Sequence, residues 1–172
     1  MKRIAGFGLL LFAIVSLCAF GYERRDILAR FDGGIGVDPI SNVVVNGPTT
    51  TVSPNTVRGI APSGQIWRIA DLDAFVTTDG RIRVHGRGLL LGGGNSIGTN
   101  ANQKVFATLF CGPATGATAF STDPAGVALE QDGDFSIDGL LSSVPPSPCT
   151  TPVLLIRTTG GTQPWFAAGI PR

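Results

Sequence analysis

From Gly64 onward the chain alternates between short runs of apolar or every-other-residue apolar positions and clusters of turn-forming residues. Runs of this length and spacing are typical of strands, and none of the longer runs has the period of a helix. The predicted strands are 66–70, 74–78, 81–91, 104–111, 127–130, 135–137, 153–158 and 165–168. About eight strands without intervening helices predict an all-β fold, an antiparallel β-sandwich of immunoglobulin-like or prealbumin-like type rather than a closed barrel.

The alternation also predicts which side chains of a strand face the core. In the run that starts at residue 81, the apolar side chains of Ile82 and Val84 alternate with charged ones, so we expect both to face the core. In the run 104–111, the same alternation places Cys111 at the end of a core-facing row. The pair Asp79-Gly80 between two predicted strands indicates a two-residue hairpin with a type I′ turn.

The region before Gly64 has a weaker pattern. Residues 23–31 could form two helical turns, and we interpret 22–31 as a spacer because so short a helix is marginal in water. Residues 32–63 are rich in Gly, Pro, Thr and Asn, with apolar islands at 43–45 and 57–60. We expect an irregular arm with one or two short edge strands, so that 22–63 form the spacer and arm and 64–172 the sandwich.

The N-terminus has the pattern of a signal peptide. Lys2 and Arg3 precede an uncharged apolar run that ends at Phe20, and small residues stand at the −3 and −1 positions of a cut after Gly21. We therefore expect residues 1–21 to be removed and the protein to be secreted or periplasmic. Two alternatives stay open: an uncleaved membrane anchor, and lipidation at Cys18.

Composition disfavours one class of partner but identifies none. Without residues 1–21 the chain has about 150 residues, the usual size of one domain, with nearly equal numbers of basic and acidic side chains. The absence of a strong basic field disfavours nucleic-acid binding. Only 15% of the residues are charged, while 24 Gly and 12 Pro favour turns and short strands.

Two cysteines, Cys111 and Cys149, follow the predicted cleavage site. In an oxidising compartment such a pair predicts a disulfide, and it is the single intramolecular pairing that remains once Cys18 is removed. We expect the two Cα atoms to lie within about 7 Å of each other.

One row of side chains suggests binding chemistry. Arg81, Arg83, His85 and Arg87 share one face of a predicted strand, where acids such as Asp71, Asp73 or Asp79 on a neighbouring strand could pair with them. The alternative is a candidate anion-binding row, because guanidinium groups bind carboxylates, phosphates and sulfates through two parallel hydrogen bonds. His85 is the sole histidine, so a Ser-His-Asp hydrolase would have to use it.

Two further segments match known loops only superficially. Residues 92–98 are glycine-rich, but no helix is predicted after them and no Lys follows Gly98, so we expect no nucleotide site. Residues 132–139 place oxygen-bearing side chains at alternate positions, yet lack the glycine and glutamate of a calcium-binding EF-hand loop. We expect no cofactor and no metal, and assign no catalytic residue.

Several segments together resemble a group of secreted bacterial proteins of uncharacterised function, over residues 32–171. The segments are Asp32-Gly-Gly-Ile-Gly-Val, Gly86-Arg-Gly-Leu-Leu-Leu, Gly93-Gly-Asn-Ser-Ile-Gly-Thr, Ala107-Thr-Leu-Phe-Cys-Gly, Asp132-Gly-Asp-Phe, Pro152-Val-Leu-Leu-Ile-Arg and Trp165-Phe-Ala-Ala-Gly-Ile-Pro. The resemblance implies export and a single domain, and it carries no catalytic or ligand-binding residues.

These observations lead to three functional hypotheses. The first is an exported, non-catalytic module with a structural or adhesive role, whose partner is an extracytoplasmic protein or glycan. The second is a domain that binds an anionic glycan or a small anion through the arginine row. The third is a secreted hydrolase that uses His85. Contact with a membrane is expected only if the N-terminal segment is kept or lipidated.

Overall fold

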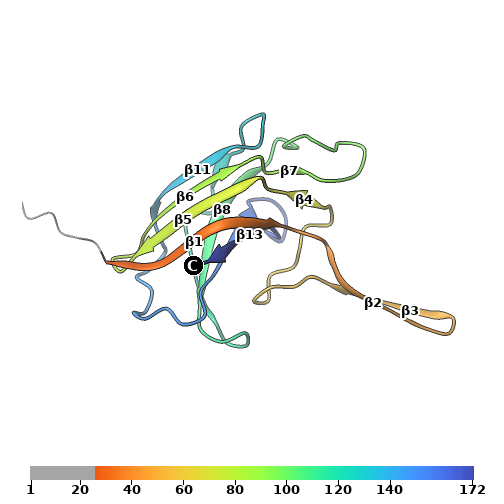
Figure 1. The fold of residues 1–172 in the computed structure, drawn as a ribbon, viewed down its shortest axis with the longest axis horizontal. Helices are drawn as coiled ribbons and strands as arrows, with labels where there is room; N and C mark the ends of the chain where they lie inside the picture. Colours follow the sequence, from red (N-terminus) through yellow and green to blue (C-terminus); the bar gives the residue numbers. More distant parts are fainter. Residues whose placement is uncertain (1–25) are drawn as a thin grey trace, which may run out of the picture.

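A computed structural model describes residues 26–172, and this part of the chain is built from strands and turns (Figure 1). The predicted signal peptide, residues 1–21, lies outside the described residues. The strands are β1 (Ile27–Gly36), β2 (Ile40–Asn46), β3 (Thr49–Pro54), β4 (Trp67–Arg68), β5 (Asp71–Thr77), β6 (Arg81–Arg87), β7 (Leu90–Leu91), β8 (Lys104–Cys111), β9 (Thr118–Ser121), β10 (Val127–Ala128), β11 (Phe135–Leu140), β12 (Val153–Thr158) and β13 (Trp165–Pro171).

One antiparallel sheet contains nine of these strands. Its order is β10-β8-β12-β13-β1-β5-β6-β11, and β9 pairs with β8 outside this path. The sheet curls, so that β8 lies behind β5 and β6 in Figure 1. A hydrogen bond of 2.7 Å from the Ser142 amide, just after β11, to the Ser121 carbonyl on β9 links the two ends of the sheet. The predicted all-β, antiparallel, sandwich-like fold is confirmed, although a single folded sheet supplies both layers.

The core lies inside the curl. Ile82 and Val84 are fully buried, as the alternation predicts. β8 is buried along both faces apart from Lys104. On its outer face Phe106 is covered by Arg157, whose guanidinium carbon lies 5.1 Å from the ring centre. A strand with both faces covered contains apolar residues at consecutive positions, as β8 does.

The spacer predicted for residues 22–31 is wrong for 27–31, and the irregular arm predicted from residue 32 is wrong for 32–36. Residues 27–36 form β1, which lies between β13 and β5 in the interior of the sheet. Ala29 and Phe31 point into the core, while Arg30 and Asp32 between and after them are exposed. This period of two fits a strand rather than the predicted helical turns. The sheet therefore extends across the predicted boundary at residue 64.

Within the rest of the arm, residues 40–54 form a separate hairpin. The apolar island 43–45 lies on its first strand, whereas 57–60 forms only an isolated bridge between Val57 and Ile60. β2 and β3 pair only with each other and project from the body of the molecule (Figure 1). The type I′ turn predicted at Asp79-Gly80 is wrong, because of these two residues only Gly80 has a positive φ, +83°. The Gly80 amide donates to the Thr77 carbonyl, so a type I turn is followed by a left-handed glycine.

Candidate interaction sites

The predicted arginine row lies on β6, on the outer face of the sheet between β5 and β11. Arg81 and Arg83 both bind Asp138 of β11, with N–O distances of 2.6 Å. Arg87 binds Asp71 of β5, also at 2.6 Å. The structure thus confirms the side of the sheet predicted for these arginines. Asp71 was one of the predicted partners of the row. Asp138, which pairs with two of its three arginines, was not predicted.

These ion pairs perturb the carboxylates. The pKa of Asp138 lies below its usual value, chiefly because Arg83 donates to it and also because Arg81 is close. The pKa of Asp71 is likewise lowered by its hydrogen bond with Arg87. The side chains in these pairs are between 38% and 68% exposed, so each pair contributes little to stability. Asp138 neutralises only one of its two arginines, which leaves that end of the row positive.

His85 lies in the middle of the same face. Its Nδ1 atom is 3.2 Å from the Ser136 hydroxyl on β11, and Asp73 is its register partner on β5. These three residue types recur in hydrolases, but the carboxylate there orients the imidazole through a hydrogen bond. Among the hydrogen bonds of residues 26–172, none joins Asp73 to His85. His85 itself is exposed on the outer surface of the sheet.

A hollow of about 320 Å³ lies at the basic end of this face. It is lined by Ile27, Arg30, Phe75, Thr77, Arg81 and Arg83. Arg30 comes from β1, the strand that sequence reasoning missed. The only local signal for this strand is the alternation of apolar and charged residues over 29–32, which is short.

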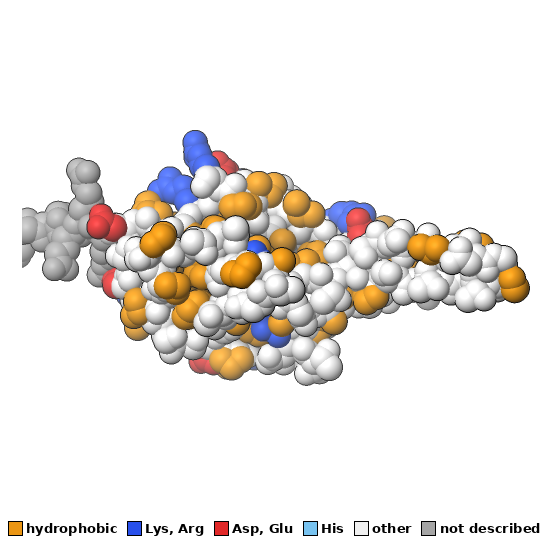
Figure 2. All heavy atoms as spheres, turned by 90° about the horizontal axis from the view of Figure 1, so that it is seen from below, with side chains coloured by type: hydrophobic (Ala, Val, Ile, Leu, Met, Phe, Trp, Pro, Cys, Tyr) orange, Lys and Arg blue, Asp and Glu red, His pale blue; other side chains and the backbone are white. Residues whose placement is uncertain are grey.

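The hairpin of β2 and β3 is a second exposed surface, and it is apolar. Val43, Val45 and Val52 are 51–66% exposed, and Val44 and Ile40 are also exposed. No charged residue occurs between Asp38 and Arg58. Figure 2 shows apolar and uncharged polar side chains, but no charged ones, along the projecting part of the hairpin on the face in view.

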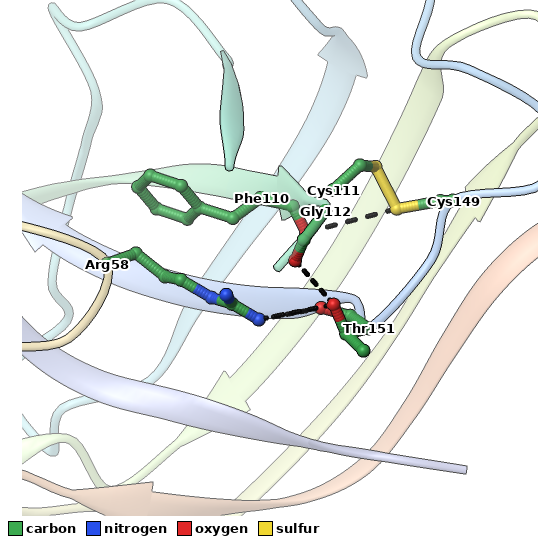
Figure 3. Close-up of a disulfide and its surroundings, with 6 residues drawn as sticks. All are labelled: Arg58, Phe110, Cys111, Gly112, Cys149 and Thr151. Carbon is green, nitrogen blue, oxygen red and sulfur yellow. Dashed lines mark hydrogen bonds between the residues drawn. A yellow bond between two sulfur atoms is a disulfide. The ribbon is translucent and has the colours of Figure 1, made fainter. Parts of the chain in front are cut away.

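The disulfide closes one end of the sheet. Cys111 at the end of β8 is bonded to Cys149, and the Cα atoms are 5.0 Å apart, which confirms the predicted pairing (Figure 3). Thr151 donates its hydroxyl to the Gly112 carbonyl, and Arg58 donates to the Thr151 carbonyl at 3.0 Å. Because Arg58 follows β3, these contacts fasten the base of the arm to the disulfide.

The two loop motifs serve the fold. Residues 92–98 form turns, and Asn100 after them donates to the carbonyls of Leu129 and Glu130. In the aspartate-rich segment, Asp134 accepts a hydrogen bond of 2.9 Å from the Gly88 amide. Within residues 26–172 no cluster of three or more His, Cys, Asp or Glu side chains could hold a metal ion.

Comparison with protein-family models, with curated proteins and with solved structures finds no match to this chain. The resemblance to secreted bacterial proteins therefore stays a prediction. The part of the chain described by the structure contains no helix that could cross a membrane. The disulfide is compatible with an oxidising location outside the cytoplasm.

Proposed function

We propose that this protein is an exported, non-catalytic interaction module with a structural or adhesive role outside the cytoplasm. The observation that carries the proposal is the projecting hairpin of β2 and β3, with its exposed valines and its lack of charge. The predicted signal peptide and the disulfide support the location. The hairpin is the element that contacts the partner, and the stapled sandwich holds it in position.

The energetics of the hairpin support this role. A two-stranded hairpin on its own is marginally stable in water, and it gains stability when a third strand or another surface covers it. Free strand edges promote aggregation, and proteins usually protect them with lysines, prolines or bulges. β2 has no lysine, and its only irregularity is a bulge between Ile40 and Asn42. Beyond this bulge, residues 42–46 form a free edge without lysine or proline, and such an edge indicates a surface that is covered in use.

The turn determines which backbone groups the hairpin offers. Gly47, with φ +60°, and Pro48 form a two-residue connection, and Asn46 is opposite Thr49. In such a hairpin the residues that flank the turn bond to each other, and bonded and non-bonded pairs then alternate. Val43 and Val45 therefore direct their amide and carbonyl groups outward from the free edge of β2. A partner that presents a strand edge can extend the sheet there.

The proposal is tested by placing charges on this edge. The double variant Val43→Lys, Val45→Lys puts two ammonium groups beside the outward backbone groups, and the matched control Ala114→Lys, Thr115→Lys adds the same charge in an exposed loop. The measurements are the fraction of protein held by the envelope of the producing cells, against the fraction released to the medium, and the sedimentation coefficient of the purified protein.

We expect the wild type and the control to be retained or assembled, and the hairpin variant to be released as monomer with an unchanged Tm. An unchanged Tm is expected because the five exposed apolar side chains of the hairpin lie outside the core. If all three proteins partition and sediment alike, the hairpin is not the contact element and the proposal fails.

A further inference from the structure

The hollow at the basic end of the sheet's outer face is distinct from the hairpin. Its size, its positive charge and its aromatic ring together match one class of ligand. It measures about 320 Å³, at the lower end of the range of small-molecule sites. β1, β5 and β6 form its floor, so its side chains stand on paired strands.

Positive charge exceeds negative charge in the hollow. Three guanidiniums, those of Arg30, Arg81 and Arg83, line it, and Asp138 at its border is the carboxylate that binds two of them. Among residues 26–172 no carboxylate lies within ion-pair distance of Arg30. Arg30 is exposed and its side chain makes no hydrogen bond within the described chain, so its donors are available to a ligand.

An aromatic ring lies at the centre of these charges. Phe75 is half-buried, and its register partners are Arg30 on β1 and Arg83 on β6. The guanidinium carbon of Arg83 lies 5.9 Å from the ring centre, within the range of a cation–π contact. Ile27 adds a second apolar side chain to the lining. An inorganic anion would use the guanidiniums but would leave this apolar surface uncovered.

We propose that the hollow binds a carboxylate-bearing sugar residue, such as a uronic acid in an acidic polysaccharide. The apolar face of the pyranose packs on Phe75. Its carboxylate accepts hydrogen bonds from Arg30, which can supply two parallel donors at the geometry a carboxylate requires. The site thus uses only part of the predicted row, Arg81 and Arg83, and adds Arg30. Arg87, with Asp71, lies at the far end of β6.

The probe is polygalacturonate, and neutral dextran and dextran sulfate are the comparison polymers. Binding is measured by calorimetry at low and at moderate salt, with the full chain as recovered from the producing cells. Arg30→Gln should weaken polygalacturonate binding about tenfold or more, since it removes a charged hydrogen-bond donor. Phe75→Leu should weaken it severalfold. Arg87→Gln, the matched control on the same face, should leave it unchanged.

A gain of affinity provides a second test that misfolding cannot imitate. Asp138→Asn removes the competing carboxylate and should tighten polygalacturonate binding. The inference is overturned if polygalacturonate does not bind at low salt, if dextran sulfate binds equally well with equal loss for Arg30→Gln and Arg87→Gln, or if neutral dextran competes. The hairpin variant Val43→Lys, Val45→Lys should bind like the wild type, so this test is independent of the proposed function.

Discussion

Reduction of the disulfide between Cys111 and Cys149 should lower the stability of the domain by a calculable amount. The bond closes a loop with a sequence separation of 38. On the chain-entropy treatment, release of such a loop increases the entropy of the unfolded chain by about 13 cal/mol/K, or about 3.9 kcal/mol at 25 °C. With about 2.1 cal/mol/K of unfolding entropy per residue over the described domain, this corresponds to a fall in Tm of about 12 °C.

The assay is calorimetric unfolding of oxidised protein and of protein reduced in denaturant and refolded with reductant present. Reduction under denaturing conditions is needed because Cys111 and Cys149 are only 4% and 8% exposed. The double variant Cys111→Ala, Cys149→Ala should unfold near the reduced wild type and should not respond to reductant. A fall of less than about 3 °C, or an equal response of the double variant, would refute the account of the bond as a constraint on the unfolded chain.

Three other perturbations test the fold and the charged face. Ile156→Ala, at a fully buried position of β12, should lower the free energy of unfolding by about 2–5 kcal/mol in urea titrations. Gly86→Ala should destabilise by about 1–3 kcal/mol, because a Cβ there would lie 2.1 Å from the ring of Phe135; Gly139→Ala, which meets nothing within 4 Å, is its control. The pKa of Asp138 is lowered in the folded state, so its stabilising effect is present above the unfolded pKa and lost as the pH falls through the folded value. The urea midpoint of Asp138→Asn should therefore fall less than that of the wild type between about pH 5 and pH 2.5.

Strands whose limits are set by their own local sequence were predictable. The predicted ranges 104–111 and 153–158 coincide with β8 and β12. Both are unbroken by Gly or Pro and are bounded by turns, so their limits can be read without knowledge of their partners. The burial of Ile82 and Val84 followed from alternation alone, because a one-residue change of register would have buried arginines.

Strands that depend on remote partners were missed. Ile27, Leu28 and Phe31 can be spaced as one side of a helix, and the choice of strand depends on β5 and β13, which are far away in sequence. β9 was missed because Phe120 is its only buried side chain.

The candidate site, too, was predictable only where local sequence determines it. The exposed arginines of β6 were evident from the alternation, but their neighbours depend on the order β1-β5-β6-β11. That order brings Asp138 and Arg30 to the row from segments 55 and 51 residues away from Arg83 and Arg81 respectively. Neither local periodicity nor spacing reports such a strand order, so the hollow could not be found from the sequence.

The position of β1 determines when the sheet can be completed during synthesis. β1 is the first strand of the described chain to be made, and one of its two partners, β13, is the last. Arg172 closes this pairing with a backbone hydrogen bond to Arg30 and an ion pair to Asp32. A chain that leaves a ribosome N-terminus first must therefore keep one edge of β1 uncovered until β13 has been released, so this pairing forms late. Loss of residues 165–171 would remove β13 from the interior of the sheet and would leave β1 and β12 as open edges.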